Sequence, residues 1–202
     1  MALIDLPRFP ESGWTVLPEV VPSVDAVLLR GKSLSPIALY EVGTRLRQTA
    51  PPVALWVSDR LDVALALGSA GLHLPADGLG PTRIRPFWSG TLSAAVHDGQ
   101  EASKQLGADL WIWGHAFPTR SKPGAPARSR LALQEVLALA TCPVLAIGGI
   151  GVDNVSQLAG LGLRGVVVQD GIWLAPNPAA AALKLKQAVS DPRWQGGGEG
   201  CN

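Results

Sequence analysis

The feature that most constrains the fold of this chain is a series of short apolar runs separated by segments with helical patterns. Most of the runs are continuous rather than alternating, which is typical of strands buried on both faces of a parallel sheet. The number of runs approaches the eight units of a (β/α)8 TIM barrel, and a chain of 202 residues can form such a barrel as a single domain. The expected strands are 26–29, 53–57, 71–74, 110–113, 144–147 and 165–168, with weaker candidates at 2–6 and 91–95.

Segments with a helical pattern fill the intervals between these runs. The alternation favours the barrel, and a doubly wound sheet is the alternative fold. The barrel domain is expected to span 1–192, and the glycine-containing segment 193–202 is expected to be a disordered tail. The expected helices are 35–48, 61–67, 99–106, 131–140, 152–159 and 178–189, whereas 81–88 is a poor helix because it contains two prolines and no clear apolar stripe.

The composition excludes several classes of protein. A hydrophobic content of 47% with 16% charged residues provides for a packed core and argues against a disordered chain. The net charge of +1 provides no field that would attract nucleic acid or a membrane surface, so neither partner is expected. The N-terminal segment lacks a signal-peptide pattern, and the two cysteines, Cys142 and Cys201, suggest no disulfide framework. The expected location is therefore the cytoplasm.

The segment 109–124 is the most informative for function. A buried run ends there at a glycine, His115 follows at once, and a loop carries Thr119, Arg120 and Lys122. In a barrel the catalytic side chains come from the carboxyl ends of the strands and the loops that follow them. Because an imidazole titrates near neutral pH, His115 is expected to be an acid–base residue beside an anionic substrate.

Two other strand ends carry candidate anion-binding groups. Arg30 and Lys32 follow the run 26–29, and they either clamp a phosphate or carboxylate or are solvated loop cations. Gly148 and Gly149 follow the run 144–147, where exposed amides beside a helix N-terminus would bind phosphate. The alternative for the two glycines is a tight turn that needs positive φ angles.

Two aspartates at strand ends have structural alternatives. Asp170 precedes Gly171 after the last run, and its carboxylate would repel a phosphate unless it points away or caps the last helix. Asp59 follows the run 53–57, where capping of a helix or an ion pair with Arg60 competes with binding of a metal ion.

Two further histidines have mainly structural interpretations. His73 lies within the run 71–74 and is expected to be a hydrogen-bonded core residue. His97 follows the run 91–95 and either lines the pocket or has a structural role.

Together these motifs resemble the superfamily of thiamine phosphate synthase and TenI-type thiazole tautomerase, over about residues 26–182. The resemblance implies a (β/α)8 barrel that binds a thiazole phosphate at the carboxyl ends of its strands. The motifs that carry it are Leu28-Leu-Arg30-Gly-Lys32, Val57-Ser-Asp59-Arg60, Gly71-Leu-His73-Leu-Pro75, Val96-His97, Gly114-His115-Ala-Phe117-Pro-Thr119 and Pro143-Val-Leu-Ala-Ile147-Gly148-Gly149. The residues expected to bind the substrate are Arg30, Lys32, Asp59, Thr119, Lys122, Gly148, Gly149, Asp170 and Gly171.

The chain departs from the synthase side of the superfamily at several positions. The synthase joins a pyrimidine pyrophosphate to thiazole phosphate and needs Mg²⁺. Leu28 stands where its pattern has a glutamine, Ser58 where it has an asparagine, and Gly78 where it has the second metal-binding aspartate. Asp77 lies one position away from that aspartate.

The tautomerase pattern matches this chain better. His73-Leu-Pro75 is similar to its motif after the fourth strand, and His115 falls on the histidine that the resemblance implies to be the acid–base residue. Ala95 and Asp170 replace serines of that pattern. The resemblance thus implies an isomerase that aromatises a carboxythiazole phosphate tautomer by a proton shift, without metal or cofactor.

Two other functions remain open. One is a thiamine phosphate synthase-like transferase with a degenerate Mg²⁺ site, and the other is a non-catalytic barrel that binds thiazole phosphate. The apolar surface of 131–140 leaves a homo-oligomer possible.

Overall fold

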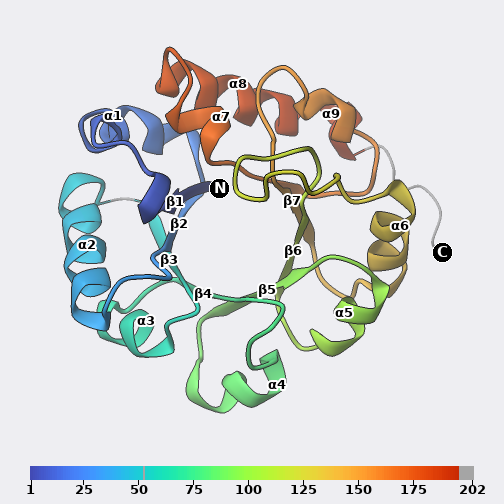
Figure 1. Ribbon diagram of the computed structural model, residues 1–202, viewed down its shortest axis with the longest axis horizontal. Coiled ribbons are helices and arrows are strands. Elements are labelled where there is room, and N and C mark those ends of the chain that lie inside the picture. Colours follow the sequence, from blue (N-terminus) through green and yellow to red (C-terminus); the bar gives the residue numbers. More distant parts are fainter. Residues whose placement is uncertain (52, 196–202) are drawn as a thin grey trace.

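The computed structural model describes residues 1–51 and 53–195. Eight parallel strands pair in sequence order, and the helices surround them (Figure 1). The barrel closes where Ala2 pairs with Val168 and the amide of Leu3 donates to the carbonyl of Val168 at 2.8 Å. This confirms the expected (β/α)8 barrel. The strands are β1 (Ala2–Asp5), β2 (Ala26–Arg30), β3 (Ala54–Ser58), β4 (Gly71–Leu74), β5 (Thr91–Val96), β6 (Leu110–Gly114), β7 (Val144–Ile147) and β8 (Gly165–Val167).

The helices of the outer ring begin at recognisable sequence signals. Side chains of Ser35, Asp98, Ser129 and Asn177 each accept a hydrogen bond from a backbone amide three residues later, which caps α2, α5, α6 and α8. The α-helices are α1 (Ser12–Val20), α2 (Pro36–Thr49), α3 (Leu61–Leu67), α4 (Pro81–Ile84), α5 (Gly99–Lys104), α6 (Arg130–Leu139), α7 (Asp170–Trp173), α8 (Pro178–Ser190) and α9 (Pro192–Gln195). Short 3-10 helices are η1 (Leu6–Arg8), η2 (Val21–Ser23), η3 (Arg85–Phe87) and η4 (Val155–Leu158).

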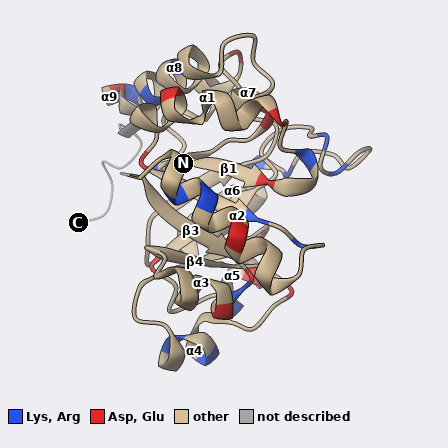
Figure 2. Cartoon of the chain, turned by 90° about the vertical axis from the view of Figure 1, so that its left-hand side faces the viewer, with Lys and Arg blue, Asp and Glu red and all other residues tan. Residues whose placement is uncertain are grey.

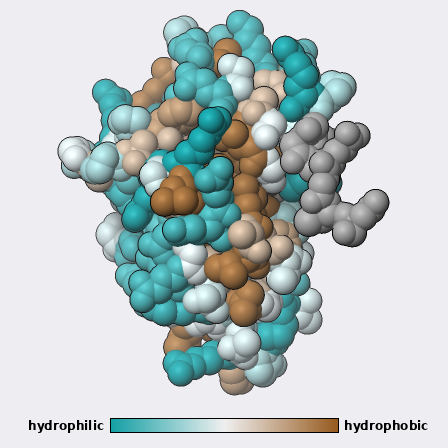
Figure 3. All heavy atoms as spheres, turned by 90° about the vertical axis from the view of Figure 1, so that its right-hand side faces the viewer, coloured by the Kyte–Doolittle hydropathy of each residue, from teal (hydrophilic) through white to brown (hydrophobic). Residues whose placement is uncertain are grey.

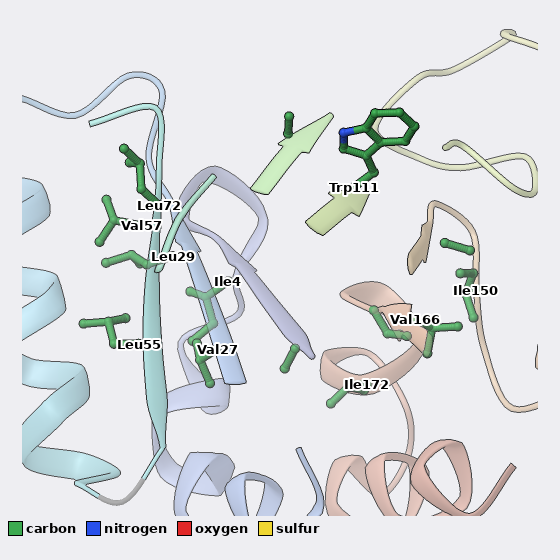
Figure 4. Close-up of a cluster of buried hydrophobic side chains, with 14 of the residues drawn as sticks. Ile4, Val27, Leu29, Leu55, Val57, Leu72, Trp111, Ile150, Val166 and Ile172 are labelled. Carbon is green, nitrogen blue, oxygen red and sulfur yellow. The ribbon is translucent and has the colours of Figure 1, made fainter. Parts of the chain in front are cut away.

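Alternate residues of each strand face two different hydrophobic clusters. Val27 and Leu29 of β2 join the large cluster between the strands and the helices, where Figure 4 shows Leu29 beside Leu55 and Val57. Leu28 lies between them in sequence and joins the smaller cluster in the barrel interior. Strands buried on both faces explain why their sequences read as continuous apolar runs. The members of the inner cluster are Leu3, Ala26, Leu28, Trp56, Ile112 and Val167.

The lower part of the barrel interior is filled by an indole ring. Trp56 of β3 is 8% exposed and lies over Gly71 of β4. A Cβ atom at Gly71 would come within 2.1 Å of this ring, so a glycine is required there. The packed interior separates this end of the barrel from the cavities at the carboxyl ends of the strands.

Three segments differ from expectation. The expected helix 152–159 is only the 3-10 turn η4, because the Asn154 side chain holds the preceding loop through the amide of Gly151. Helix α1 was not anticipated, since its segment contains Gly13 and Pro18. The expected tail begins inside α9, where Trp194 is buried, whereas 196–202 lie outside the described residues.

The surface carries mixed charge and scattered apolar side chains. Figure 2 shows basic and acidic segments interspersed over the helices. On the face shown in Figure 3, apolar atoms appear between polar ones, and Leu131 and Leu139 of α6 are 64% and 44% exposed. Nothing in this face identifies a partner, so the homo-oligomer stays a prediction. Among the described residues, no helix is long and apolar enough to cross a membrane.

Candidate functional site

Two adjoining cavities open at the carboxyl ends of the strands. The larger has a volume of about 630 Å³ and is lined by residues within or just after β1 to β7. The smaller has a volume of about 360 Å³ and lies over the loops after β7 and β8. Thr119, Arg120 and Ser121 of the loop between β6 and α6 line both cavities, and Figure 1 shows this loop over the barrel mouth beside β7. We call them the cationic cavity and the glycine-loop cavity.

The cationic cavity combines an apolar floor with a charged rim. Its floor includes Leu28 and Ile112 of the inner cluster. Five basic and three acidic side chains line the cavity, so the balance is positive. Such a cavity suits an aromatic ring that carries a phosphate or diphosphate. The basic residues are Arg8, Arg30, Lys32, Arg120 and Lys122, and the acidic ones are Asp5, Asp77 and Glu101.

A buried carboxylate holds two of these arginines. Asp5 is 4% exposed, and its two carboxylate oxygens lie 2.8 Å from Arg30 Nη1 and 3.0 Å from Arg8 Nη2. Arg8 Nη2 also donates to Gln169 Oε1 at 2.7 Å, which ties the loop after β1 to the loop after β8. One carboxylate against two guanidinium groups leaves a net positive charge in the cavity. Sequence analysis missed Asp5 and Arg8, although the strand-end rule applies to β1 as well.

Lys122 forms part of a group of three polar side chains at the rim. Its Nζ lies 3.4 Å from His97 Nε2, and His97 Nδ1 lies 2.5 Å from Glu101 Oε2. The three residues line the cationic cavity from a loop, the end of β5 and α5. The structure therefore places His97 in the pocket, and Glu101 is an additional site residue that sequence analysis did not identify.

His115 lies near the expected glycine loop, but its ring is enclosed. A Cβ atom at Gly148 would come within 2.3 Å of His115 Cβ, so the two backbones pack closely. The residue is 6% exposed, and within the described chain neither ring nitrogen has a hydrogen-bond partner. His115 nevertheless lines the cationic cavity, with both ring nitrogens buried in this conformation. The acid–base role expected for it stays a prediction.

The glycine-loop cavity depends on two glycines with positive φ. Gly148 has φ of 99° and Gly149 has φ of 65°, as the tight-turn alternative required. The Asn154 side chain braces the turn by donating to the carbonyl of Gly149 at 2.8 Å. Gly171 packs against this loop, because a Cβ atom there would lie 2.2 Å from the carbonyl oxygen of Ile150. Among the described residues, the amides of Gly148 and Gly149 donate no hydrogen bond, which leaves them available to a ligand.

Basic and acidic side chains around the glycine-loop cavity are equal in number. Arg8 and Arg120 line it together with Asp153 and Asp170. Asp170 is the first residue of α7 and does not cap the last long helix, because Asn177 Oδ1 performs that role for α8. The carboxylate of Asp170 therefore lines the cavity and opposes binding of a phosphate.

Asp59 lies apart from both cavities. It is exposed, has φ of 62° and lines neither cavity. It also provides no side-chain cap for α3, and Arg60 pairs with Asp62 at 2.6 Å instead of with Asp59. The expectation of a substrate contact by Asp59 therefore has no support from its position.

The residues present do not fit a divalent cation held by the protein. Asp77 lines the cationic cavity, but Gly78 beside it has no ligating side chain and Asp59 lies outside the cavity. Throughout residues 1–51 and 53–195, no group of three or more His, Cys, Asp or Glu side chains could hold a metal ion. We therefore derive no chemical step through a bound metal.

His73 has the structural role expected for it. Its Nδ1 lies 2.9 Å from Ser93 Oγ. Burial and, to a smaller extent, the positive charge of Arg30 lower the pKa of His73 to about 4. His73 is therefore neutral at physiological pH and adds no positive charge to the cavity.

Comparison with known proteins identifies relatives of the whole barrel. The chain matches the family model described as thiamine monophosphate synthase over residues 15–172. It is 37% identical over 145 residues to thiamine-phosphate synthase from Chlorobium phaeovibrioides, covering 67% of each chain. It is 35% identical over 184 residues to thiamine-phosphate synthase from Methanoregula boonei, covering 85% of this chain and 82% of the relative.

Solved structures agree with these relatives. Thiamine phosphate pyrophosphorylase from Pyrococcus furiosus superposes with a TM-score of 0.79 at 28% identity, covering 94% of this chain and 95% of that one. A 3-hexulose-6-phosphate synthase with 20% identity and a TM-score of 0.67, covering 93% of this chain and 97% of that one, shares the fold. With a family match over most of its length and relatives of this similarity, the chain belongs to the thiamine phosphate synthase/TenI superfamily of thiamin biosynthesis.

Proposed function

We propose that this chain is a transferase of the thiamine phosphate synthase type, which joins a pyrimidine diphosphate to a thiazole phosphate. The observation that carries the proposal is the pair of adjoining cavities that share residues 119–121. A reaction between two substrates needs two neighbouring sites, whereas isomerisation of one substrate needs one. The names of the relatives point to the same reaction class.

The charge of each cavity suggests which substrate it takes. The diphosphate carries the larger negative charge, so it belongs in the cationic cavity beside Arg30, Lys32 and Lys122. The thiazole phosphate belongs in the glycine-loop cavity, with its phosphate at the amides of Gly148, Gly149 and Gly171. Thr119 lies between the two, where it can contact either substrate.

The transfer exchanges one bond for another. The carbon–oxygen bond between the pyrimidine methylene group and the diphosphate breaks, and the electron pair leaves with the diphosphate. A new bond forms between that methylene carbon and the thiazole nitrogen. Lys122 and Arg30 stabilise the negative charge that develops on the leaving group, and such oriented charges are often the largest contribution to catalysis.

This proposal replaces the tautomerase as the leading interpretation. Tautomerisation requires a base with an accessible lone pair, and both ring nitrogens of His115 are enclosed and have no partner among the described residues. A transfer reaction with a diphosphate leaving group does not require His115 to accept a proton.

One pair of assays tests the proposal. Purified protein is incubated with the pyrimidine diphosphate and thiazole phosphate, with and without added Mg²⁺, and thiamine phosphate and diphosphate are quantified. We expect the two products in equal amounts. In parallel, aromatisation of a carboxythiazole phosphate tautomer is followed by ultraviolet absorbance. Aromatisation without coupling would replace the proposal by the tautomerase, and binding without turnover would leave a ligand-binding barrel.

A further inference from the structure

Three side chains form a connected chain at the rim of the cationic cavity, and two of them, His97 and Glu101, lie outside the expected binding set. Glu101 of α5 contacts His97 at the end of β5, and His97 contacts Lys122 in the loop before α6. The side chains of His97 and Glu101 are 20% and 34% exposed, so the contact is partly shielded from water. The reaction proposed above gives no role to His97 or Glu101.

The partners of His97 define its protonation state. An ammonium group has only hydrogen atoms to donate, so Nε2 of His97 must accept from Lys122 Nζ. Nδ1 then carries the hydrogen atom and donates it to the carboxylate of Glu101. This arrangement assigns the Nδ1–H form to the imidazole, with Glu101 holding its orientation and the lone pair of Nε2 directed at the lysine.

Other charged groups surround this chain. On α5, the Asp98 side chain accepts from the amide of Glu101 at 2.9 Å. From α6, Glu135 lies 3.4 Å from the amide of Gly99. Asp77 and Arg120 line the same cavity. Lys122 is the cation in direct contact with His97, and its movement would change the field at Nε2 more than any of these groups.

We infer that His97 positions the Lys122 ammonium group and takes up a proton when Lys122 turns to an anionic ligand. Without a ligand, the Lys122 ammonium group donates a hydrogen bond to the lone pair of Nε2, and this contact keeps the imidazole neutral. When a diphosphate attracts Lys122, Nε2 is released beside a negative charge, with the carboxylate of Glu101 still at Nδ1. Both charges favour the imidazolium form, so a proton from the buffer binds Nε2 and Lys122 remains an ammonium ion.

This inference rests on the anion site of the proposed function but not on group transfer. It is therefore tested with inorganic diphosphate, which binds without turnover. Titration calorimetry in buffers with different ionisation enthalpies gives the number of protons taken up for each anion bound. A chain that binds diphosphate with proton uptake but forms no thiamine phosphate would support the inference and reject the transferase.

The expected result is uptake of up to one proton for each diphosphate bound at pH 7.5 to 8. Diphosphate itself can take up a proton, so the contribution of His97 is the difference in proton uptake between the wild type and His97→Gln. We expect this variant to lose that uptake and to bind diphosphate about tenfold more weakly. Glu101→Gln should reduce the uptake, whereas Glu41→Gln, an exposed residue of α2, should leave it unchanged.

A spectroscopic measurement on the wild type keeps the test independent of how the variants fold. In protein labelled with 15N-histidine, diphosphate should move the Nε2 resonance of His97 from the unprotonated to the protonated position. Equal proton uptake in the wild type and His97→Gln would overturn the inference. So would an unchanged Nε2 resonance at saturating diphosphate.

Discussion

The two cavities at the barrel mouth differ in how they present positive charge. The cationic cavity uses side chains, with five basic against three acidic residues, and Asp5 holds two of the basic ones. The glycine-loop cavity has two of each and depends on backbone amides fixed by Gly148 and Gly149. Lysine and arginine side chains can follow a ligand whose charge changes during a reaction, whereas backbone amides cannot move without the loop.

This difference gives each cavity a separate task. A leaving diphosphate gains charge as its bond breaks, and the mobile cations of the cationic cavity suit it. A phosphate that only anchors its substrate keeps its charge, and rigid amides are sufficient for it. The balanced charge around the amides then limits how strongly they hold that phosphate. Four experiments test this difference between the two cavities.

The largest effect is expected from a change in the rigid loop. Gly149→Ala places a Cβ atom 2.3 Å from the carbonyl oxygen of Pro118, at φ of 65°. We expect the free energy of unfolding to fall by about 3 kcal/mol, measured by urea denaturation. Gly124→Ala is the matched control, since φ is 74° there but no atom lies within 4 Å, and about 1 kcal/mol is expected. Equal losses would mean that the loop is not tightly packed.

The next effect concerns the mobile cations. Lys122→Ala should lower kcat/KM for coupling about 100-fold, because it removes a charged donor from the leaving group. Lys184→Ala, on the exposed face of α8, serves as the control and should change nothing. An unchanged kcat/KM in Lys122→Ala would remove the cationic cavity from the reaction.

Lowering the pH should reduce the free energy of unfolding of the protein through His73. Burial lowers the pKa of this residue from 6.5 to about 4, so the unfolded chain binds its proton first as the pH falls. The free energy of unfolding should therefore decrease by about 2 kcal/mol between pH 7 and pH 4.5 through His73. Chemical denaturation of the wild type and of His73→Gln at several pH values gives their free energies of unfolding. The difference between the two slopes of this free energy with pH measures the contribution of His73. Parallel slopes would contradict it.

The smallest effect tests the charge balance of the glycine-loop cavity. Asp170→Ser removes one of its two carboxylates and should strengthen binding of thiazole phosphate about tenfold, measured by calorimetry. Binding of the corresponding thiazole alcohol should not change, because it carries no phosphate. If both ligands gained affinity equally, Asp170 would act through shape and not through charge.

The sequence was sufficient to predict the barrel because each strand is buried on both faces. The run 71–74 coincides with β4 and 144–147 with β7, and the other strands differ at their ends by one or two residues. Helix α1 buries Trp14, Leu17 and Val20 at helical spacing, but Gly13 and Pro18 in the same segment argued against a helix. The segment 152–159 shows an apolar period, but the Asn154 side chain accepts a hydrogen bond from the amide of Gly151, and the segment forms only a 3-10 turn.

The sequence predicted which residues lie at the barrel mouth, but it did not predict where their side chains point. The strand-end rule correctly brought Arg30, Lys32, Lys122 and the glycines to the mouth. The rule could not predict whether His97 or His115 directs a ring nitrogen into the cavity, because that depends on the direction of the side chain. His97 has both ring nitrogens paired in the cavity, whereas His115 has both enclosed. Asp59 likewise follows a strand but lines neither cavity, since a position next to a strand end does not fix the direction of a side chain.

The indole of Trp56 over Gly71 has a consequence for how reactants come and go. Because this ring fills the barrel axis below the cationic cavity, a ligand in that cavity reaches and leaves it from the carboxyl ends of the strands. Both reactants of the proposed transfer therefore share one side of the barrel for entry and release.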